Sequence, residues 1–151
     1  LQLYYMGESD DNPYTRVAKK YNIPDALKDI CKKYNLEYVV FQGEMYGQNI
    51  QKRDYGLKEV KVAGFNLIFS GKGRLNSVVS KNIMDEYGIP WVPILDTHYI
   101  LPNTVEELLD YAESDTSKID DGLREGIVFR SPDGSKSFKA VSNKFLLKYH
   151  S

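Results

Sequence analysis

EGIVFRSPDGSKSFKAV, residues 125–141, is the stretch that decides the fold class of this chain. The β-branched and aromatic residues of Gly126–Arg130 predict a strand. Pro132–Gly134 has the residues of a tight turn, so Ser137–Val141 is predicted to return beside the first strand as a hairpin. We therefore expect antiparallel pairing at this end of the chain.

Upstream of the hairpin, apolar residues at helical spacing are mixed with shorter β-branched and aromatic runs. The predicted helices cover 13–21, 24–35, 76–88, 103–113 and 143–149, and the further predicted strands cover 37–43, 60–69 and 90–95. The fourth helix is expected to turn one apolar face to the core, formed by Val105, Leu108, Leu109 and Ala112. This order lacks a regular βαβ alternation, which favours an α+β fold with largely antiparallel sheets flanked by helices.

Composition gives the broad class of the protein. The 151 residues fit a single domain, 1–151, and the hydrophobic share of 42% is ordinary for a globular chain. The net charge of −1 gives no argument for nucleic-acid binding. Cys31 is the only cysteine, so an internal disulfide is impossible and a reducing, cytoplasmic setting is expected. We expect neither a membrane span nor a signal peptide.

Three segments differ from ordinary core material. Glu44 follows an apolar strand and lies between two glycines, which let a backbone approach a ligand closely. Glu125 precedes the strand Gly126–Arg130, in which alternate side chains point to opposite faces. Lys139 occupies the middle of the returning strand and shares a face with Val141, where an inward lysine would need an anion. The plainer alternatives are a solvated carboxylate for Glu44 and an edge-strand lysine that blocks aggregation for Lys139.

The order of these segments carries more information than each segment alone. Gly43-Glu44, then Gly64–Phe69, then Glu125–Arg130 and Phe138-Lys139 resemble motifs III, IIIa, IV and V of the covalent nucleotidyltransferase superfamily. That superfamily includes DNA ligases, RNA ligases and mRNA capping enzymes. The tail SFKAVSNKFLLK, residues 137–148, looks most like the RNA ligase branch that includes RNA-repair ligases, and NPY at 12–14 with VAKKY at 17–21 looks like the same branch. The implied activity is that of an ATP-dependent RNA ligase.

The sequence departs from this family at one motif. The family attaches AMP to the lysine of Lys-x-Asp-Gly, and the chain contains no such tetrapeptide; the segment at 118–122, KIDDG, comes nearest but has the wrong spacing and position. We therefore expect the chain to be an N-terminally truncated nucleotidyltransferase domain whose nucleophilic lysine lies upstream. Such a fragment would be inactive alone.

The resemblance also implies roles for individual residues. Glu44 would contact the ribose hydroxyls of ATP or help to hold a metal ion, and Phe65 would stack on adenine. Glu125 would coordinate Mg²⁺ or Mn²⁺, which favour carboxylate and phosphate oxygens. Lys139 would bind the α-phosphate and stabilise its developing charge. Glu125 and Lys139 are thus the predicted catalytic residues.

One position of the last motif is filled unusually. Many relatives have a second lysine two residues after the first, where this chain has Val141. Lys148 or Lys136 could supply the missing cation.

The expected partner is RNA with 5′-phosphate and 3′-hydroxyl ends. A basic cluster formed by Lys52, Arg53 and Lys58 is interleaved with tyrosines, a mixture that suits single-stranded or nicked RNA, although a solvated loop is the simpler explanation. The competing functions are a DNA ligase, a capping guanylyltransferase and a non-catalytic nucleotide-binding or nucleic-acid-binding module. The oligomeric state is left open.

Overall fold

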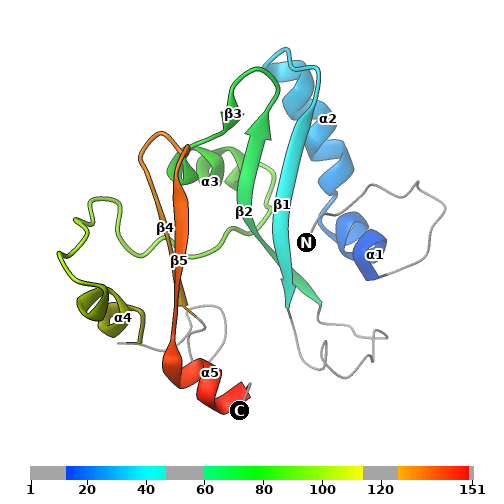
Figure 1. Cartoon of the computed structure of the whole chain (residues 1–151). Coiled ribbons are helices and arrows are strands. Elements are labelled where there is room, and N and C mark those ends of the chain that lie inside the picture. The colour runs from blue at the N-terminus through cyan, green and yellow to red at the C-terminus, as the bar shows by residue number, and fades with distance from the viewer. Residues whose placement is uncertain (1–12, 47–59, 114–125, 150–151) are drawn as a thin grey trace. The chain divides into compact units, whose positions relative to one another are not determined.

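The structure, a computed structural model, describes residues 13–46, 60–113 and 126–149 (Figure 1). The chain divides into two compact units, Leu1–Val92 and Pro93–Ser151. Both units combine helices with small antiparallel sheets, so the expected α+β class is confirmed. The assignment of 1–151 to a single functional domain stays a prediction. Within the described ranges, no helix is long and apolar enough to cross a membrane.

The first unit contains three helices and one sheet. The sheet has the order β1-β2-β3, and both pairings are antiparallel. In chain order the elements are α1 (Pro13–Lys20), α2 (Ile23–Lys33), β1 (Val39–Tyr46), β2 (Lys61–Phe69), β3 (Gly73–Arg74) and α3 (Ser77–Asp85).

The helix starts of this unit follow from local chemistry. Asn22, between α1 and α2, adopts a left-handed conformation with φ 52°, which asparagine tolerates better than most residues. Asn76 caps α3, because its Oδ1 accepts hydrogen bonds from the backbone N–H groups of Val78 at 2.8 Å and Val79 at 3.3 Å. The helix predicted over 76–88 therefore begins at the N-cap Asn76.

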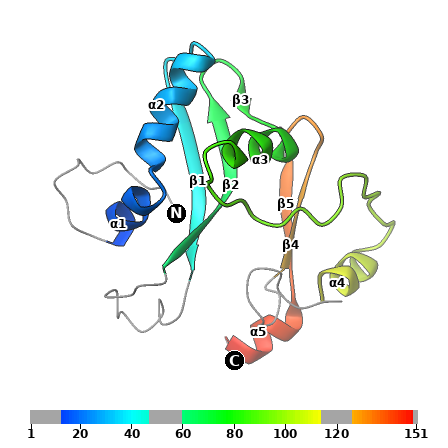
Figure 2. The ribbon, with the colours of Figure 1, turned by 180° about the vertical axis from the view of Figure 1, so that it is seen from behind.

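The core of the first unit lies between the sheet and its helices. Helices α2 and α3 lie on the same face of the β1–β2 pair, as the view from behind shows (Figure 2). Both helices are amphipathic, so their apolar faces pack on this side of the sheet and their polar faces meet water. The most deeply buried large side chains are Ile30, Leu67, Met84 and Ile89.

An irregularity interrupts the pairing of β1 and β2. Gln42 pairs with Asn66 and Gly43 pairs with Gly64, so Phe65 is an extra residue on β2 and the register shifts there. On the other edge of β2, Gly64 forms a parallel bridge with Trp91, supported by backbone hydrogen bonds to the flanking residues. The predicted strand 90–95 is wrong beyond this bridge. Prolines at 90 and 93 have no N–H to donate, which prevents a longer ladder.

The second unit is built on the predicted hairpin, which is confirmed. Ile127 pairs with Ala140 and Val128 pairs with Lys139, in antiparallel register. The elements are α4 (Val105–Glu113), β4 (Gly126–Arg130), β5 (Ser137–Val141) and α5 (Asn143–Tyr149). Helix α4 packs on the hairpin, and the buried centre of this packing is formed by Ala112, Ile127 and Ala140.

Aromatic rings extend this small core. Tyr99 stacks on Tyr111 with ring centroids 4.7 Å apart, and Phe129 stacks on Phe138 at 5.0 Å. Leu108 and Leu109 pack against the core as predicted, but Val105 does not. Val105 is 71% exposed because it is the first residue of α4 and lies beyond the face that packs on the hairpin.

The turn of the hairpin is held by one carboxylate. Asp133 Oδ1 accepts hydrogen bonds from Ser131 Oγ at 2.6 Å, Ser135 Oγ at 2.7 Å and the Ser135 backbone N–H at 2.9 Å. Because these bonds favour the charged form, they hold the pKa of Asp133 well below its usual range. The turn therefore fixes the register of β4 and β5 from one end.

Candidate functional site

The hairpin of the second unit has one core face and one open face. Ile127, Phe129 and Ala140 point to the core, so the alternation places Val128 and Lys139 on the opposite face. Val128 is 49% exposed, and Lys139 is exposed beside it. The prediction that Lys139 shares a face with Val141 is thus confirmed. Lys139 is thus an exposed cation in the middle of the open strand face.

The start of β4 leaves no room for a side chain. A Cβ atom on Gly126 would overlap the carbonyl oxygen of Ala140 and lie 3.0 Å from the Cα of Val141. The backbone therefore holds the two strands at close approach at this point. Glu125, the predicted metal ligand, immediately precedes this glycine in the sequence and lies outside the described residues.

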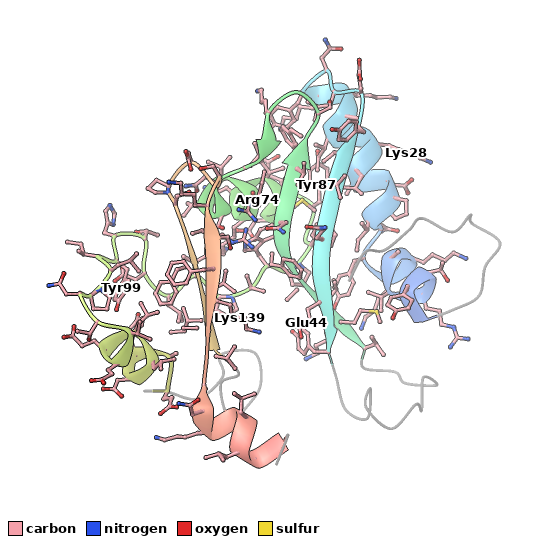
Figure 3. All side chains as sticks on the ribbon, viewed as in Figure 1. Lys28, Glu44, Arg74, Tyr87, Tyr99 and Lys139 are labelled. Atoms are coloured by element: carbon pink, nitrogen blue, oxygen red, sulfur yellow. The ribbon has the colours of Figure 1, made fainter. Side chains whose placement is uncertain are left out.

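In the first unit, Glu44 lies inside β1 instead of following it as predicted. The strand continues to Tyr46, Glu44 pairs with Ala63, and its side chain is exposed (Figure 3). Strand alternation and pairing put Glu44 on the same face as Gln42 and Asn66. Asn66 Nδ2 donates a hydrogen bond to Gln42 Oε1 at 2.7 Å. Within the described part of the chain, Asn66 Oδ1 is buried and has no hydrogen-bond partner.

Phe65, the predicted adenine-stacking residue, is the extra residue of β2 and is half-buried. A bulge of this kind changes the direction of a side chain relative to regular alternation. Its contact with adenine stays a prediction.

The remaining predicted residues fall into two groups. Lys136 and Lys148, the two candidates for the missing second lysine, are both exposed in the second unit. The basic cluster formed by Lys52, Arg53 and Lys58 lies outside the described residues.

The predicted site residues are thus divided between the two units. Glu44 belongs to the first unit and Lys139 to the second, and the structure gives no arrangement of one unit relative to the other. The prediction that Glu44, Glu125 and Lys139 meet at one nucleotide therefore stays a prediction.

Carboxylates are the groups with which the predicted site would hold a metal ion. Among residues 13–46, 60–113 and 126–149, no group of three or more histidine, cysteine, aspartate or glutamate side chains is close enough to hold an ion. Glu44 offers one exposed carboxylate, which is the ligand type that Mg²⁺ and Mn²⁺ prefer. The donor chemistry at Glu44 fits a divalent cation whose other ligands would be phosphate oxygens or water.

Comparison with known proteins identifies the family. The family model described as RNA ligase matches residues 3–150. The chain belongs to the RNA ligase family. The solved structures that match the chain establish its nucleotidyltransferase-type fold. The search of curated proteins found no match.

Solved structures of Naegleria gruberi RNA ligase resemble this RNA ligase family member closely. A mutant in the apo form superposes with a TM-score of 0.79 at 28% identity, over 95% of this chain and 42% of that one. A glutamate-to-alanine mutant with AMP and Mn gives 0.79 at 27% identity, over 95% and 43%. The enzyme with PPi gives 0.76 at 27%, over 95% and 42%. The chain therefore spans less than half of the length of these Naegleria proteins.

Sequence reasoning missed the polar pair beside Glu44. Gln42 precedes Glu44 by two residues, so simple alternation already indicated that it shares the face of Glu44. Asn66 carried no such signal, because its pairing with Gln42 depends on the position of the bulge at Phe65.

Proposed function

We propose that this chain is the nucleotide-binding part of an ATP-dependent RNA ligase. The observation that carries the proposal is the exposed position of Lys139 in mid-strand, at the place of the last motif of the family. An exposed lysine in mid-strand can bring its ammonium group to a phosphate at the open face of the hairpin. The neighbouring structures of the Naegleria enzyme with ATP and Mn, and with AMP and Mn, support the choice of nucleotide.

In this function the complete protein would transfer AMP twice. A lysine would attack the α-phosphorus of ATP and release pyrophosphate, and AMP would then pass to the 5′-phosphate of RNA. Attack by a 3′-hydroxyl would join the ends and release AMP. Such transfers depend on positioning and charge neutralisation more than on covalent help. The residues of this chain would supply these two effects.

The individual roles follow from chemistry and position. Lys139 would hold the α-phosphate and offset its growing charge in the transition state. Glu44 would accept hydrogen bonds from the ribose hydroxyls or join Glu125 in holding a divalent metal, which would neutralise phosphate charge when bound. Phe65 would stack on the adenine ring.

The RNA substrate and the setting complete the proposal. The ends would be a 5′-phosphate and a 3′-hydroxyl, and the protein would act in the cytoplasm. The basic cluster of Lys52, Arg53 and Lys58 would contact the RNA backbone.

The test uses the complete protein that contains this chain. It is incubated with ATP or GTP labelled at the α-phosphate, and then with nicked RNA or nicked DNA of the same sequence. We expect labelling by ATP alone and sealing of the RNA substrate. Labelling by GTP alone would indicate a capping-type enzyme, sealing of DNA in preference would indicate a DNA ligase, and no labelling by either nucleotide would leave only a binding module.

The 151-residue chain provides an internal check. Because it contains no Lys-x-Asp-Gly, we expect no lysyl-AMP on this chain under the same conditions. A stable AMP adduct mapped to any of its lysines would contradict this expectation.

A further inference from the structure

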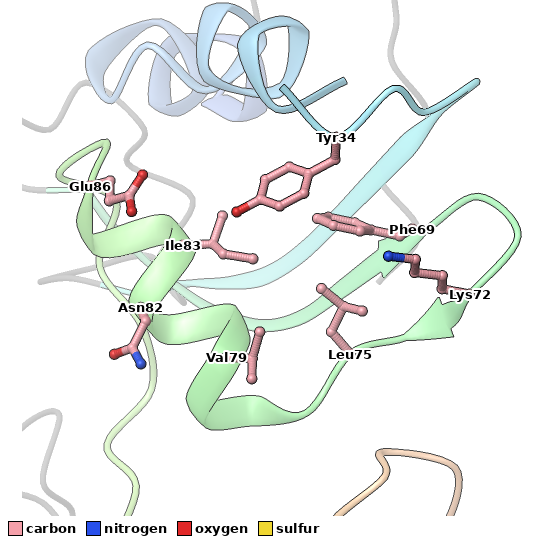
Figure 4. Close-up of a pocket in the computed structure, with 8 residues that line it drawn as sticks. All are labelled: Tyr34, Phe69, Lys72, Leu75, Val79, Asn82, Ile83 and Glu86. Carbon is pink, nitrogen blue, oxygen red and sulfur yellow. The ribbon is translucent and has the colours of Figure 1, made fainter. Parts of the chain in front are cut away.

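A hollow of about 290 Å³ opens on the helical side of the first unit (Figure 4). Its walls come from the end of α2, the end of β2, the β2–β3 turn and α3, and they are formed by Tyr34, Phe69, Lys72, Leu75, Val79, Asn82, Ile83 and Glu86. None of these residues belongs to the predicted nucleotide site. Ligand pockets range over roughly 300–1,000 Å³, so this hollow is at the small end and suits one flat group.

The walls of the hollow combine an open aromatic ring with aliphatic side chains. Tyr34 is 37% exposed, and its ring lies 5.1 Å from that of Phe69 in a tilted arrangement. Figure 4 shows the Tyr34 ring on one side of the hollow and the side chains of Leu75 and Val79 on the other. Two apolar walls of this kind can hold a flat aromatic group between them, as base-stacking sites do.

The wall of the hollow carries one ammonium group, Lys72, and one carboxylate, Glu86, and the carboxylate is paired with a lysine outside the wall. Glu86 is the carboxylate in its wall, and Lys33 Nζ donates to Glu86 Oε2 at 3.1 Å, a bond that raises the pKa of Lys33. Lys33 Nζ also lies 5.7 Å from the centre of the Tyr34 ring. In the described part of the chain, the Lys72 ammonium group has no ion-pair partner. A phosphate group at the rim would therefore complement Lys72.

We infer that this hollow binds one unpaired base of single-stranded RNA, stacked on Tyr34, with an adjacent phosphate on Lys72. Asn82 also lines the hollow, and its amide carries both a donor and an acceptor. A peptide segment could use the apolar walls, but it would leave the Lys72 charge uncompensated unless it were acidic. The inference rests on the proposed function, because it assigns a contact to the RNA that the ligase would join.

The test measures binding of a fluorescein-labelled single-stranded RNA 12-mer to the 151-residue chain by anisotropy. Because stacking of a base on one aromatic ring contributes substantially to RNA affinity, Tyr34→Leu should weaken binding about tenfold. Tyr34→Phe keeps the ring and should bind like the unaltered chain. Lys72→Gln should lower the slope of log affinity against log salt by about 0.7, the effect of one lost phosphate contact to a single strand. Lys81→Gln is the matched control, because Lys81 pairs with Asp85 and does not line the hollow.

Each outcome decides one question. Equal binding by the unaltered chain, Tyr34→Leu and Lys72→Gln overturns the inference and leaves the proposed ligase function intact. Absence of RNA binding by the unaltered chain also overturns it, and lysyl-AMP formation in the complete protein then shows whether the ATP-dependent activity stands. Tyr34→Leu could lose affinity because the chain unfolds, and a lowered thermal midpoint would reveal this. Lys72→Gln preserves the packing of Phe69, so its salt dependence of RNA binding then decides whether the hollow contacts RNA.

Discussion

The indole ring of Trp91 packs directly on Gly64, so that a Cβ atom at residue 64 would lie 2.6 Å from Trp91 Cε3. The same Cβ would lie 2.5 Å from Cε2 of Phe41, and Phe41 and Trp91 themselves form an edge-to-face pair at 6.3 Å. Neither ring can easily move away from Gly64. The backbone of residue 64 is hydrogen-bonded to Pro90 and Val92 on one side and pairs with β1, which carries Phe41, on the other. Gly64 is therefore a packing requirement of the sheet that also carries Glu44.

We expect Gly64→Ala to lower the free energy of unfolding by about 1–3 kcal/mol, which is the usual cost of inserting a methyl group into a close-packed site. Chemical denaturation with the intrinsic fluorescence of Trp91, the only tryptophan, measures this loss directly. Combining Gly64→Ala with Phe41→Leu should recover part of it, because the leucine removes the ring atom nearest to the new methyl group. Strict additivity of the two substitutions would contradict the proposed clash.

Local chemistry explains how much of the fold was predictable. The hairpin of 126–141 was predicted because its turn residues and its alternation act within a few positions. The start of helix α3 was predicted for the same reason, because Asn76 caps it within three positions. By contrast, β3 consists of only Gly73 and Arg74, and two residues give no periodic pattern to detect. The strand expected at 90–95 failed because prolines limited the pairing to Trp91.

The candidate site divides in the same way. The face of Lys139 followed from strand alternation alone, whereas the hydrogen bond between Asn66 and Gln42 depends on a bulge that pairing across 24 positions creates. Val105 was wrongly predicted to face the core, because helical spacing alone does not show where the hairpin that supports the helix ends. Contacts between distant segments are therefore the part that a pattern within one segment cannot supply.

Tyr87 ties the end of α3 to α2, and this contact should give a characteristic pH dependence. Its hydroxyl donates to Asp29 Oδ2 at 2.6 Å, which raises the pKa of Tyr87 to about 12. A pKa raised above that of the unfolded chain stabilises the fold below pH 10, and the stabilisation is lost as the pH rises toward 12. We expect Tyr87→Phe to cost less than about 1 kcal/mol at pH 8, because the pair is open to water. The difference from the unaltered chain should shrink between pH 10 and 12 in denaturation experiments.

Tyr38→Phe is the matched control for this measurement. Tyr38 is 53% exposed, and its hydroxyl forms no hydrogen bond with the described residues. Its substitution should leave stability unchanged at every pH. A pH-independent difference for Tyr87→Phe would show that the bond to Asp29 contributes nothing.

Asp133 should make the hairpin sensitive to acid. Because its pKa is held below the ordinary aspartate value of about 4, the hydrogen bonds to Ser131 and Ser135 stabilise the turn above that pH and weaken as the pH falls further. Asp133→Ala should therefore lower the hydrogen-exchange protection of the β4 and β5 amides at pH 6. The gap between variant and unaltered chain should narrow below pH 4, whereas a gap that stays constant would contradict a role for the charged carboxylate.

Lys139→Gln should separate activity from stability. The side chain is exposed, so the substitution should change the free energy of unfolding by no more than about 0.5 kcal/mol. In the complete protein it should slow lysyl-AMP formation by about 10²–10³-fold, the usual effect of removing one group that stabilises developing charge. Lys144→Gln, an exposed lysine of α5 with no assigned role, should retain normal labelling. Full activity of Lys139→Gln would remove the phosphate-binding assignment.

The valine at 141 allows a test of which cation replaces the second lysine of the family motif. Val141 is half-buried opposite Gly126, so a lysine there could run its stem along the strand and place its ammonium group on the face of Lys139. If Lys148 supplies the second charge, Lys148→Gln should slow adenylylation about tenfold, equivalent to the loss of one charged contact. Adding Val141→Lys to Lys148→Gln should then restore the rate, as measured by transfer of labelled AMP. Loss of activity in Lys136→Gln with normal activity in Lys148→Gln would instead assign the compensating charge to Lys136.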